Sequence, residues 1–165
     1  MNYSINNISD YIINYANETH RNVTNLKLQK ILYFLYGFYY SETGNLLFDE
    51  DFEAWEDGPV VRKSFEKYSA YKDKFIPPNN EYFNLFSEDS CQGAMGFISN
   101  DYRNAISIST SIRIDELLNT LLSVPVEELV DFSRSENGPW YKTFEKGKVN
   151  LILKEDICKY FRYLK

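Results

Sequence analysis

The sequence has little of the chemistry on which most enzymes depend. It contains one histidine and two cysteines. A Ser-His-Asp triad would have to be built around His20, but this residue lies in the polar turn NETHRNVTN, and no serine occupies a GxSxG motif. Cys91 and Cys158 form no CxxC pair, so they indicate neither a zinc site nor a disulfide framework and are typical of a reducing compartment. We therefore expect a cytoplasmic protein without catalytic residues, not an enzyme.

Phosphate-binding loops and membrane-spanning segments are also missing. Gly93 and Gly96 lack the preceding strand and the lysine of a phosphate loop. The acids of FDEDFE, residues 48–53, could hold a cation, but their spacing lacks the glycine and the terminal glutamate of an EF-hand, which favours a solvated acidic turn. No apolar run approaches the ~20 residues of a membrane span, and the N-terminus has no basic start typical of a signal peptide. The sequence thus predicts no cofactor, no metal and no membrane contact.

Positive charge is in deficit. The chain has 24 acidic residues against 18 lysines and arginines, a formal net charge of -6. Non-specific binding to nucleic acids depends on lysine and arginine side chains that neutralise phosphates, so this balance argues against direct nucleic-acid binding. An acidic face would instead suit a basic protein partner.

Apolar residues at helical spacing, in contrast, run through most of the chain. Asn7 is expected to cap a first helix, and Thr24 a second one, which ends at Gly44 and is apolar almost all round after Lys30. We expect this second helix to be the central, most buried one. Further helices are predicted over IDELLNTLL and over PVEELVDFS, which begins at Pro125. A terminal helix is predicted from about Leu151 or Lys154 onward, and its inward-facing residues are Ile157, Tyr160, Phe161 and Leu164. The sequence predicts a mainly α fold: a single compact helical domain, residues 1–165, with a small β element.

The β element is expected in LLFDEDFEAW, where Phe48, Phe52 and Ala54 alternate with acids. Gly58-Pro59 breaks this segment, and Pro59 suits the first turn of a following helix because its missing N–H would have no partner there. Trp55 precedes the break and has two interpretations. Its ring either packs under the turn or serves as a contact for a partner, since tryptophan is enriched among interface hot spots. A second Gly-Pro, at Gly138-Pro139 before Trp140, raises the question of whether the two turns share one face.

Several motifs together resemble one known family. These are LKLQKILYFLYGFYY, LLFDEDFEAWEDGPVV, SENGPW and a terminal ILKEDICKYF, spread from about Thr24 to Phe161. They are similar to the Panacea domain family, also described as SocA-like antitoxins and as phage-associated GepA-type proteins. The most specific part is the F-D-E-D-F-E-A-W-x-x-G-P-V block behind an L-K-L-Q-K-x-L-Y-F helix.

The resemblance implies a mostly helical bacterial antitoxin that neutralises a toxin by binding it. It also implies a possible second partner, an AAA+ protease, because the founding member is described as a proteolytic adaptor. An alternative is a regulator encoded by a phage or mobile element that binds a host protein, such as a defence or nucleic-acid-processing factor. Many members carry a Thr-His pair where Ser133 and Arg134 stand here. A mechanism that needs an imidazole there is therefore excluded, whereas a binding mechanism is not affected.

The expected partner-binding surface lies around the first Gly-Pro turn. Its residues come from the acid-rich segment, from the turn and from the second Gly-Pro-Trp. The sequence specifies neither the identity of the toxin nor the oligomeric state of the protein. The residues are Asp51, Glu53, Trp55, Asp57, Gly58, Pro59, Val60 and Trp140.

Overall fold

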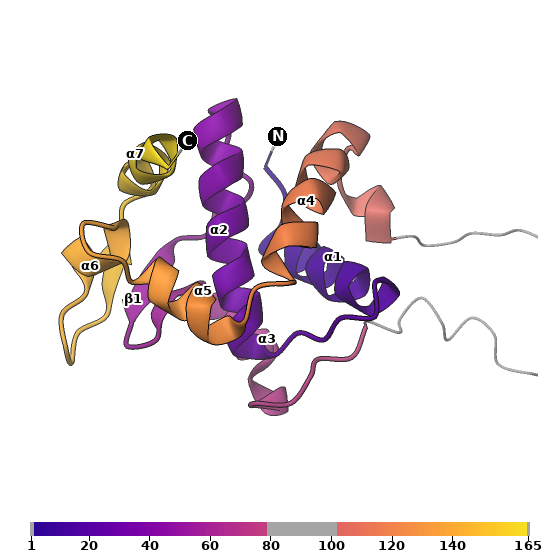
Figure 1. Cartoon of the computed structure of the whole chain (residues 1–165), viewed down its shortest axis with the longest axis horizontal. Coiled ribbons are helices and arrows are strands. Elements are labelled where there is room, and N and C mark those ends of the chain that lie inside the picture. The colour runs from indigo at the N-terminus through magenta and orange to yellow at the C-terminus, as the bar shows by residue number, and fades with distance from the viewer. Residues whose placement is uncertain (1, 79–101, 165) are drawn as a thin grey trace, which may run out of the picture.

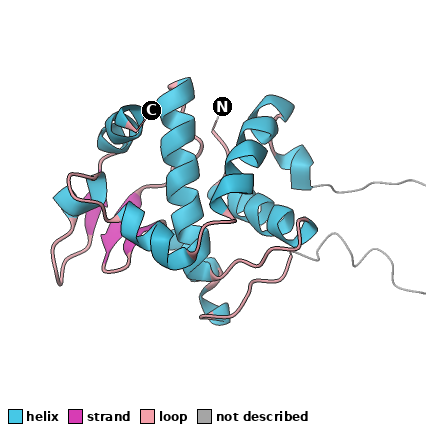
Figure 2. Cartoon of the chain, in the orientation of Figure 1, coloured by secondary structure: helices cyan, strands magenta, loops and turns pink. Residues whose placement is uncertain are grey.

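The computed structural model describes residues 2–78 and 102–164, and it is mainly helical with one small sheet (Figures 1 and 2). The helices are α1 (Ile5–Glu18), α2 (Asn25–Thr43), α3 (Arg62–Lys67), α4 (Ile108–Leu121), α5 (Val126–Ser133), α6 (Pro139–Thr143) and α7 (Lys154–Tyr163), with short 3-10 helices at Ser69–Tyr71 and Tyr102–Ala105. The strands β1 (Phe52–Trp55), β2 (Gly58–Val60) and β3 (Asn150–Ile152) form an antiparallel sheet in the order β2-β1-β3. The expectation of a mainly α fold with a small β element is confirmed.

Helix α2 is the centre of the molecule. Figure 1 shows it between α7 and the sheet on one side and α1 and α4 on the other, with α5 crossing near its N-terminal half. Every residue from Leu28 to Gly37 is buried. The predicted ends are confirmed: the Thr24 side chain accepts a hydrogen bond from the Lys27 N–H, and Gly44 adopts the left-handed conformation, with φ 70°.

The other helices follow the predicted periods with three corrections. Ser4, not Asn7, caps α1, because starting the helix at Ile5 buries one more apolar residue on the same face. Pro59 lies in β2 and α3 begins only at Arg62. At the C-terminus, Ile157 and Phe161 are buried as expected, but Leu164 follows the end of α7 and is 53% exposed. The Cys158 thiol is free and buried.

An aromatic cluster joins α2 to the sheet and to α7. Tyr33 lies edge-on to Phe52 and Phe161, with ring centroids 5.5 and 5.4 Å away, and Tyr36 lies 5.4 Å from Phe52. The hydroxyl groups of Tyr33 and Tyr36 are buried and have no hydrogen-bond partner in the described part of the chain. Each leaves a desolvated polar group in the core, which is a cost to stability.

We expect Tyr33→Phe and Tyr36→Phe to raise the free energy of unfolding, each by on the order of 1 kcal/mol, because each removes a buried hydroxyl that has no hydrogen-bond partner among the described residues. The matched control is Tyr11→Phe, which removes a hydroxyl that donates to Asp115 at 2.7 Å and should lower stability. Urea denaturation of the three variants measures the difference. A loss of stability in Tyr33→Phe as large as that in Tyr11→Phe would contradict the expectation.

Candidate partner-binding site at the Trp55 hairpin

The first Gly-Pro turn is a β-hairpin. β1 pairs with β2 in the register Glu53–Val60, Ala54–Pro59 and Trp55–Gly58, so Glu56 and Asp57 form the turn. Along β1 the side chains alternate: Phe52 and Ala54 are buried in the core, and Glu53 and Trp55 lie on the outward face of the sheet. Pro59 fits β2 because it pairs with Ala54 at a position where its missing N–H is not needed.

Two polar residues of α2 satisfy the outer edge of β2. The Lys30 ammonium donates to the Pro59 carbonyl at 3.0 Å, and the Val61 N–H donates to the Gln29 side-chain oxygen at 3.0 Å. Positions 59 and 61 are two apart, so these backbone groups point to the same edge, away from β1. Gln29 and Lys30 are themselves completely buried. The polar pair in the otherwise apolar LKLQK helix therefore holds the GPVV strand in place.

Lys30 is an unusual charge in this core. Burial lowers its pKa from 10.5 to about 7, although the nearby Asp57 carboxylate partly opposes this shift and Arg134 adds to it. Gly58, with φ 104°, lies directly against this group: a Cβ at Gly58 would be 2.8 Å from the Lys30 ammonium and 2.6 Å from the Ser133 hydroxyl. The hairpin thus requires glycine at position 58 for both conformation and space.

The two Gly-Pro segments meet in space. The Trp140 indole N–H donates to the Trp55 carbonyl at 2.7 Å, and Trp140 is buried while stacked on Phe144 at 4.6 Å. The Arg134 guanidinium lies over the Trp140 ring at 5.5 Å and donates to the Glu56 carbonyl at 3.4 Å. Through Trp140, the second Gly-Pro-Trp therefore holds the hairpin in place from α6.

The Trp55 ring is half-buried on the outward face of the sheet. Its N–H donates to the Glu53 carboxylate at 2.6 Å, and its ring lies 4.9 Å from Phe65. Arg62 lies over the ring at 5.3 Å and donates two hydrogen bonds to the same Glu53 carboxylate, at 2.9 and 2.7 Å. Both interpretations of Trp55 thus have a geometric basis, since the ring contacts Phe65 and Arg62 and is still partly exposed.

Most acids around the hairpin already have a cation. Glu50 pairs with Lys63 at 2.8 Å, Asp51 with Lys154 at 3.1 Å, and Glu53 with Arg62. In residues 2–78 and 102–164, no three His, Cys, Asp or Glu side chains gather where they could hold a metal ion. Glu56 and Asp57, at the tip, are exposed and form no ion pair within these residues. The unneutralised negative charge of the hairpin is therefore at its tip.

The eight residues expected at the surface gather at this hairpin but differ in exposure. Asp51 and Asp57 are exposed, and Glu53 and Trp55 are half-buried. The remaining four are buried, and they hold the hairpin without being accessible to a partner: Gly58, Pro59, Val60 and Trp140. The structure adds residues that the sequence analysis did not assign to the site, namely Gln29, Lys30, Arg62, Ser133 and Arg134. For Gln29 and Lys30, the signal in the sequence was a pair of adjacent polar residues within an otherwise apolar helix.

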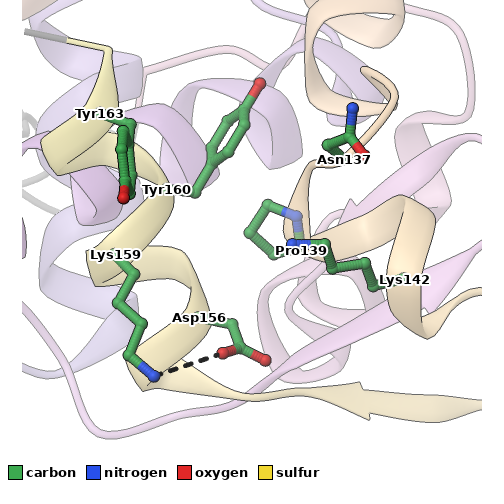
Figure 3. A pocket seen from close by; sticks show the side chains of 7 residues that line it. All are labelled: Asn137, Pro139, Lys142, Asp156, Lys159, Tyr160 and Tyr163. Carbon is green, nitrogen blue, oxygen red and sulfur yellow. Dashed lines mark ion pairs between the residues drawn. The ribbon is translucent and has the colours of Figure 1, made fainter.

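A shallow pocket lies beside this site, between α6 and α7 (Figure 3). It lies outside the expected surface. Asp156 and Lys159 on its α7 wall form an ion pair at 4.0 Å. Two lysines against one aspartate give the pocket a positive balance. The lining residues are Asn137, Pro139, Lys142, Asp156, Lys159, Tyr160 and Tyr163.

The fold defines the class of protein as a small, mainly helical domain in which Trp140 of α6 binds a β-hairpin. Comparison with known proteins shows its family. Residues 28–141 match the family described as antitoxin SocA-like, Panacea domain. Over 136 residues the chain is 29% identical to Antitoxin SocA of Caulobacter vibrioides, covering 82% of this chain and 68% of that protein. No solved structure matches significantly. The chain belongs to the SocA-like antitoxin family with a Panacea domain. None of the described helices is long and apolar enough to span a membrane.

Proposed function

We propose that this protein neutralises a toxin by direct stoichiometric binding, and that the exposed part of the Trp55 hairpin is the contact. Membership of an antitoxin family supports a toxin as the partner. The hairpin supports the site, because it is the place where an accessible tryptophan and unneutralised acids occur together on a fixed backbone. The contact residues are Trp55, Glu56 and Asp57, with Arg62 beside them.

The observation that carries the site is the set of contacts that hold the hairpin. Trp55 is held by Glu53 and Phe65, its carbonyl is bound by Trp140, and the opposite edge is bound by Lys30. A side chain that is already ordered loses little entropy on binding, so its contact area is converted into affinity more fully. The tip acids favour a partner with a basic surface and a faster, salt-sensitive association.

The test is co-expression with the product of the neighbouring gene, followed by titration of one purified protein against the other. We expect rescue of growth at a fixed molar ratio and a complex that co-purifies. Trp55→Ala should weaken binding by at least ~2 kcal/mol, and Glu56→Lys with Asp57→Lys should slow association at low salt. The matched control, Asp73→Lys with Glu116→Lys, changes the net charge equally at exposed positions away from the hairpin and should not alter affinity.

Thermal melts separate a binding defect from a folding defect. Trp55→Ala is expected to lower stability only moderately, since the ring is half-exposed, while its effect on binding is larger. Normal affinity for Trp55→Ala would reject the hairpin as the contact. Rescue by substoichiometric amounts of this protein, with no complex and no protease present, would reject binding as the mechanism.

The same system tests whether binding is enough. We propose that sequestration suffices, so rescue should persist in a strain that lacks the AAA+ protease. If a complex still forms but rescue disappears in that strain, the protein acts as a proteolytic adaptor.

A further inference from the structure

The carboxylate of Glu53 is shared between the Trp55 indole and the Arg62 guanidinium. Its Oε2 atom accepts from the indole N–H at 2.6 Å and from Arg62 Nη2 at 2.7 Å, and its Oε1 atom accepts from Arg62 Nε at 2.9 Å. A guanidinium that binds both oxygens of a carboxylate fixes the plane of that carboxylate. Arg62 therefore fixes the acceptor that the indole N–H binds.

Helix α3 supplies two further contacts to the Trp55 ring. Arg62 and Phe65 are three positions apart, so they lie on one face of this helix. The Arg62 guanidinium lies over the ring, 5.3 Å from its centroid, and the Phe65 ring meets it edge-on at 4.9 Å. Arg62 also pairs with Glu66 on the same helix, at 3.8 Å. The ring is thus held by Glu53 and by two residues of α3.

Glu53 itself is poorly accessible to a partner. It lies on the central strand, opposite Val60 of β2 and Leu151 of β3, and opposite residues of antiparallel strands share a face. Its side chain is only 13% exposed, against 47% for the side chain of Arg62. Glu53 was predicted as part of the partner-binding surface, but these features suit it to support Trp55 and not to contact a partner.

We propose that Glu53 is a positioning residue: together with Arg62 it holds the Trp55 ring in one orientation, so that the partner meets an ordered ring. This inference rests on the proposed function of the hairpin. A tryptophan on the surface of a sheet can otherwise occupy several rotamers, and binding must then select one of them. Because immobilising such a side chain costs affinity, loss of the Glu53 carboxylate should weaken partner binding roughly three- to tenfold through Trp55.

NMR of the indole N–H groups tests the orientation of the ring in the free protein. The chain has two tryptophans, and the Trp140 N–H, bound to the Trp55 carbonyl, reports on the hairpin backbone. In Glu53→Leu the Trp55 N–H should shift upfield and its order parameter should fall, with the Trp140 signal unchanged. Glu53→Gln keeps an acceptor oxygen for the indole and should retain most of the order. A Trp55 ring as ordered in Glu53→Leu as in the wild type would overturn the proposal.

Glu50→Leu is the matched control for the lost charge. Glu50 forms an ion pair at 2.8 Å with Lys63, which lies on the same helix as Arg62, so its removal changes the net charge by the same amount. The acceptor of the Trp55 indole N–H is Glu53, so the Trp55 signal in Glu50→Leu should stay as in the wild type. An equal loss of ring order in the two variants would contradict the proposal, because the effect would then come from the charge.

A double-mutant cycle with the product of the neighbouring gene tests the link to binding. Glu53→Leu should weaken binding in the wild-type background and have no further effect in Trp55→Ala, because the ring that Glu53 holds is then absent. The same loss in both backgrounds would show that Glu53 acts by its charge or by direct contact, and the proposal would fail. Normal affinity of Trp55→Ala would instead reject the hairpin as the contact, and the NMR result would still decide whether Glu53 orders the ring.

Discussion

Gly58→Ala is expected to lower the free energy of unfolding by about 3 kcal/mol or more. Two costs combine at this position. The backbone φ of 104° is strained for any residue with a Cβ, by roughly 1–3 kcal/mol. The new methyl would also lie 2.6 Å from the Ser133 hydroxyl and 2.8 Å from the Lys30 ammonium, both buried, and such overpacking costs a further 1–3 kcal/mol, approximately. Urea denaturation measures the sum.

Gly44 separates the two costs. It also has a positive φ, 70°, but a Cβ there would meet nothing within 4 Å. Gly44→Ala should therefore show the strain without the clash, at about 1 kcal/mol. Adding Ser133→Ala to Gly58→Ala removes one of the clashing atoms and should recover part of the loss, a coupling of about 1 kcal/mol. Equal losses for Gly58→Ala and Gly44→Ala would show that the close packing around Lys30 is absent in solution.

Local signals in the sequence were sufficient to predict the longer helices α1, α2, α4, α5 and α7, whereas the short helix α6 was not predicted. Thr24 and Gly44 mark the ends of α2, and its almost continuous apolar surface indicated that it is the central, buried helix. The hairpin was only half predicted. The alternation in FEAW indicated β1, but Pro59 was assigned to a helix. A proline is acceptable in an edge strand where its missing N–H would point away from the neighbouring strand, and only the pairing of β2 with β1 shows that Pro59 occupies such a position.

The candidate site could also be predicted only in part. The sequence shows acids and a tryptophan near a turn, and in the structure these residues lie at one hairpin. Their exposure could not be predicted, because it depends on contacts from distant segments: Trp140 of α6 binds the Trp55 carbonyl, and Phe65 packs against the Trp55 ring. Strand β3 was missed because its short segment, NLI, alternates too few residues to be distinguished from a loop.

The last expected result concerns pH. Lys30 has a pKa of about 7 in the folded protein and an ordinary value near 10.5 in the unfolded chain. Between these values the unfolded chain binds a proton that the folded protein does not, so stability rises with pH by up to about 1.4 kcal/mol per unit. Below about pH 7 both states are protonated and the dependence on this group ends. The rise in the free energy of unfolding should therefore begin near pH 7. Below that pH the buried, charged Lys30 lowers stability the most.

Buried tyrosines set the pH above which stability stops rising. Burial raises the pKa of Tyr33 and of Tyr68 far above 10, the latter with help from a hydrogen bond to Asp10. From about pH 10 the unfolded chain loses protons that these residues retain in the folded protein, so stability falls again. Unfolding free energies measured in urea should thus increase by up to about 3 kcal/mol between about pH 7.5 and 9.5 and decline above that range.

Lys30→Met assigns the slope to this one group. The variant keeps much of the side-chain volume but has no proton to exchange, so most of the rise between about pH 7.5 and 9.5 should disappear. A smaller slope should remain from Lys27, whose pKa burial also lowers. The control Lys63→Met, at an exposed position, should keep the full dependence. If Lys30→Met retained the wild-type slope, the slope would not arise from Lys30, and burial would not lower the pKa of this lysine in the folded protein.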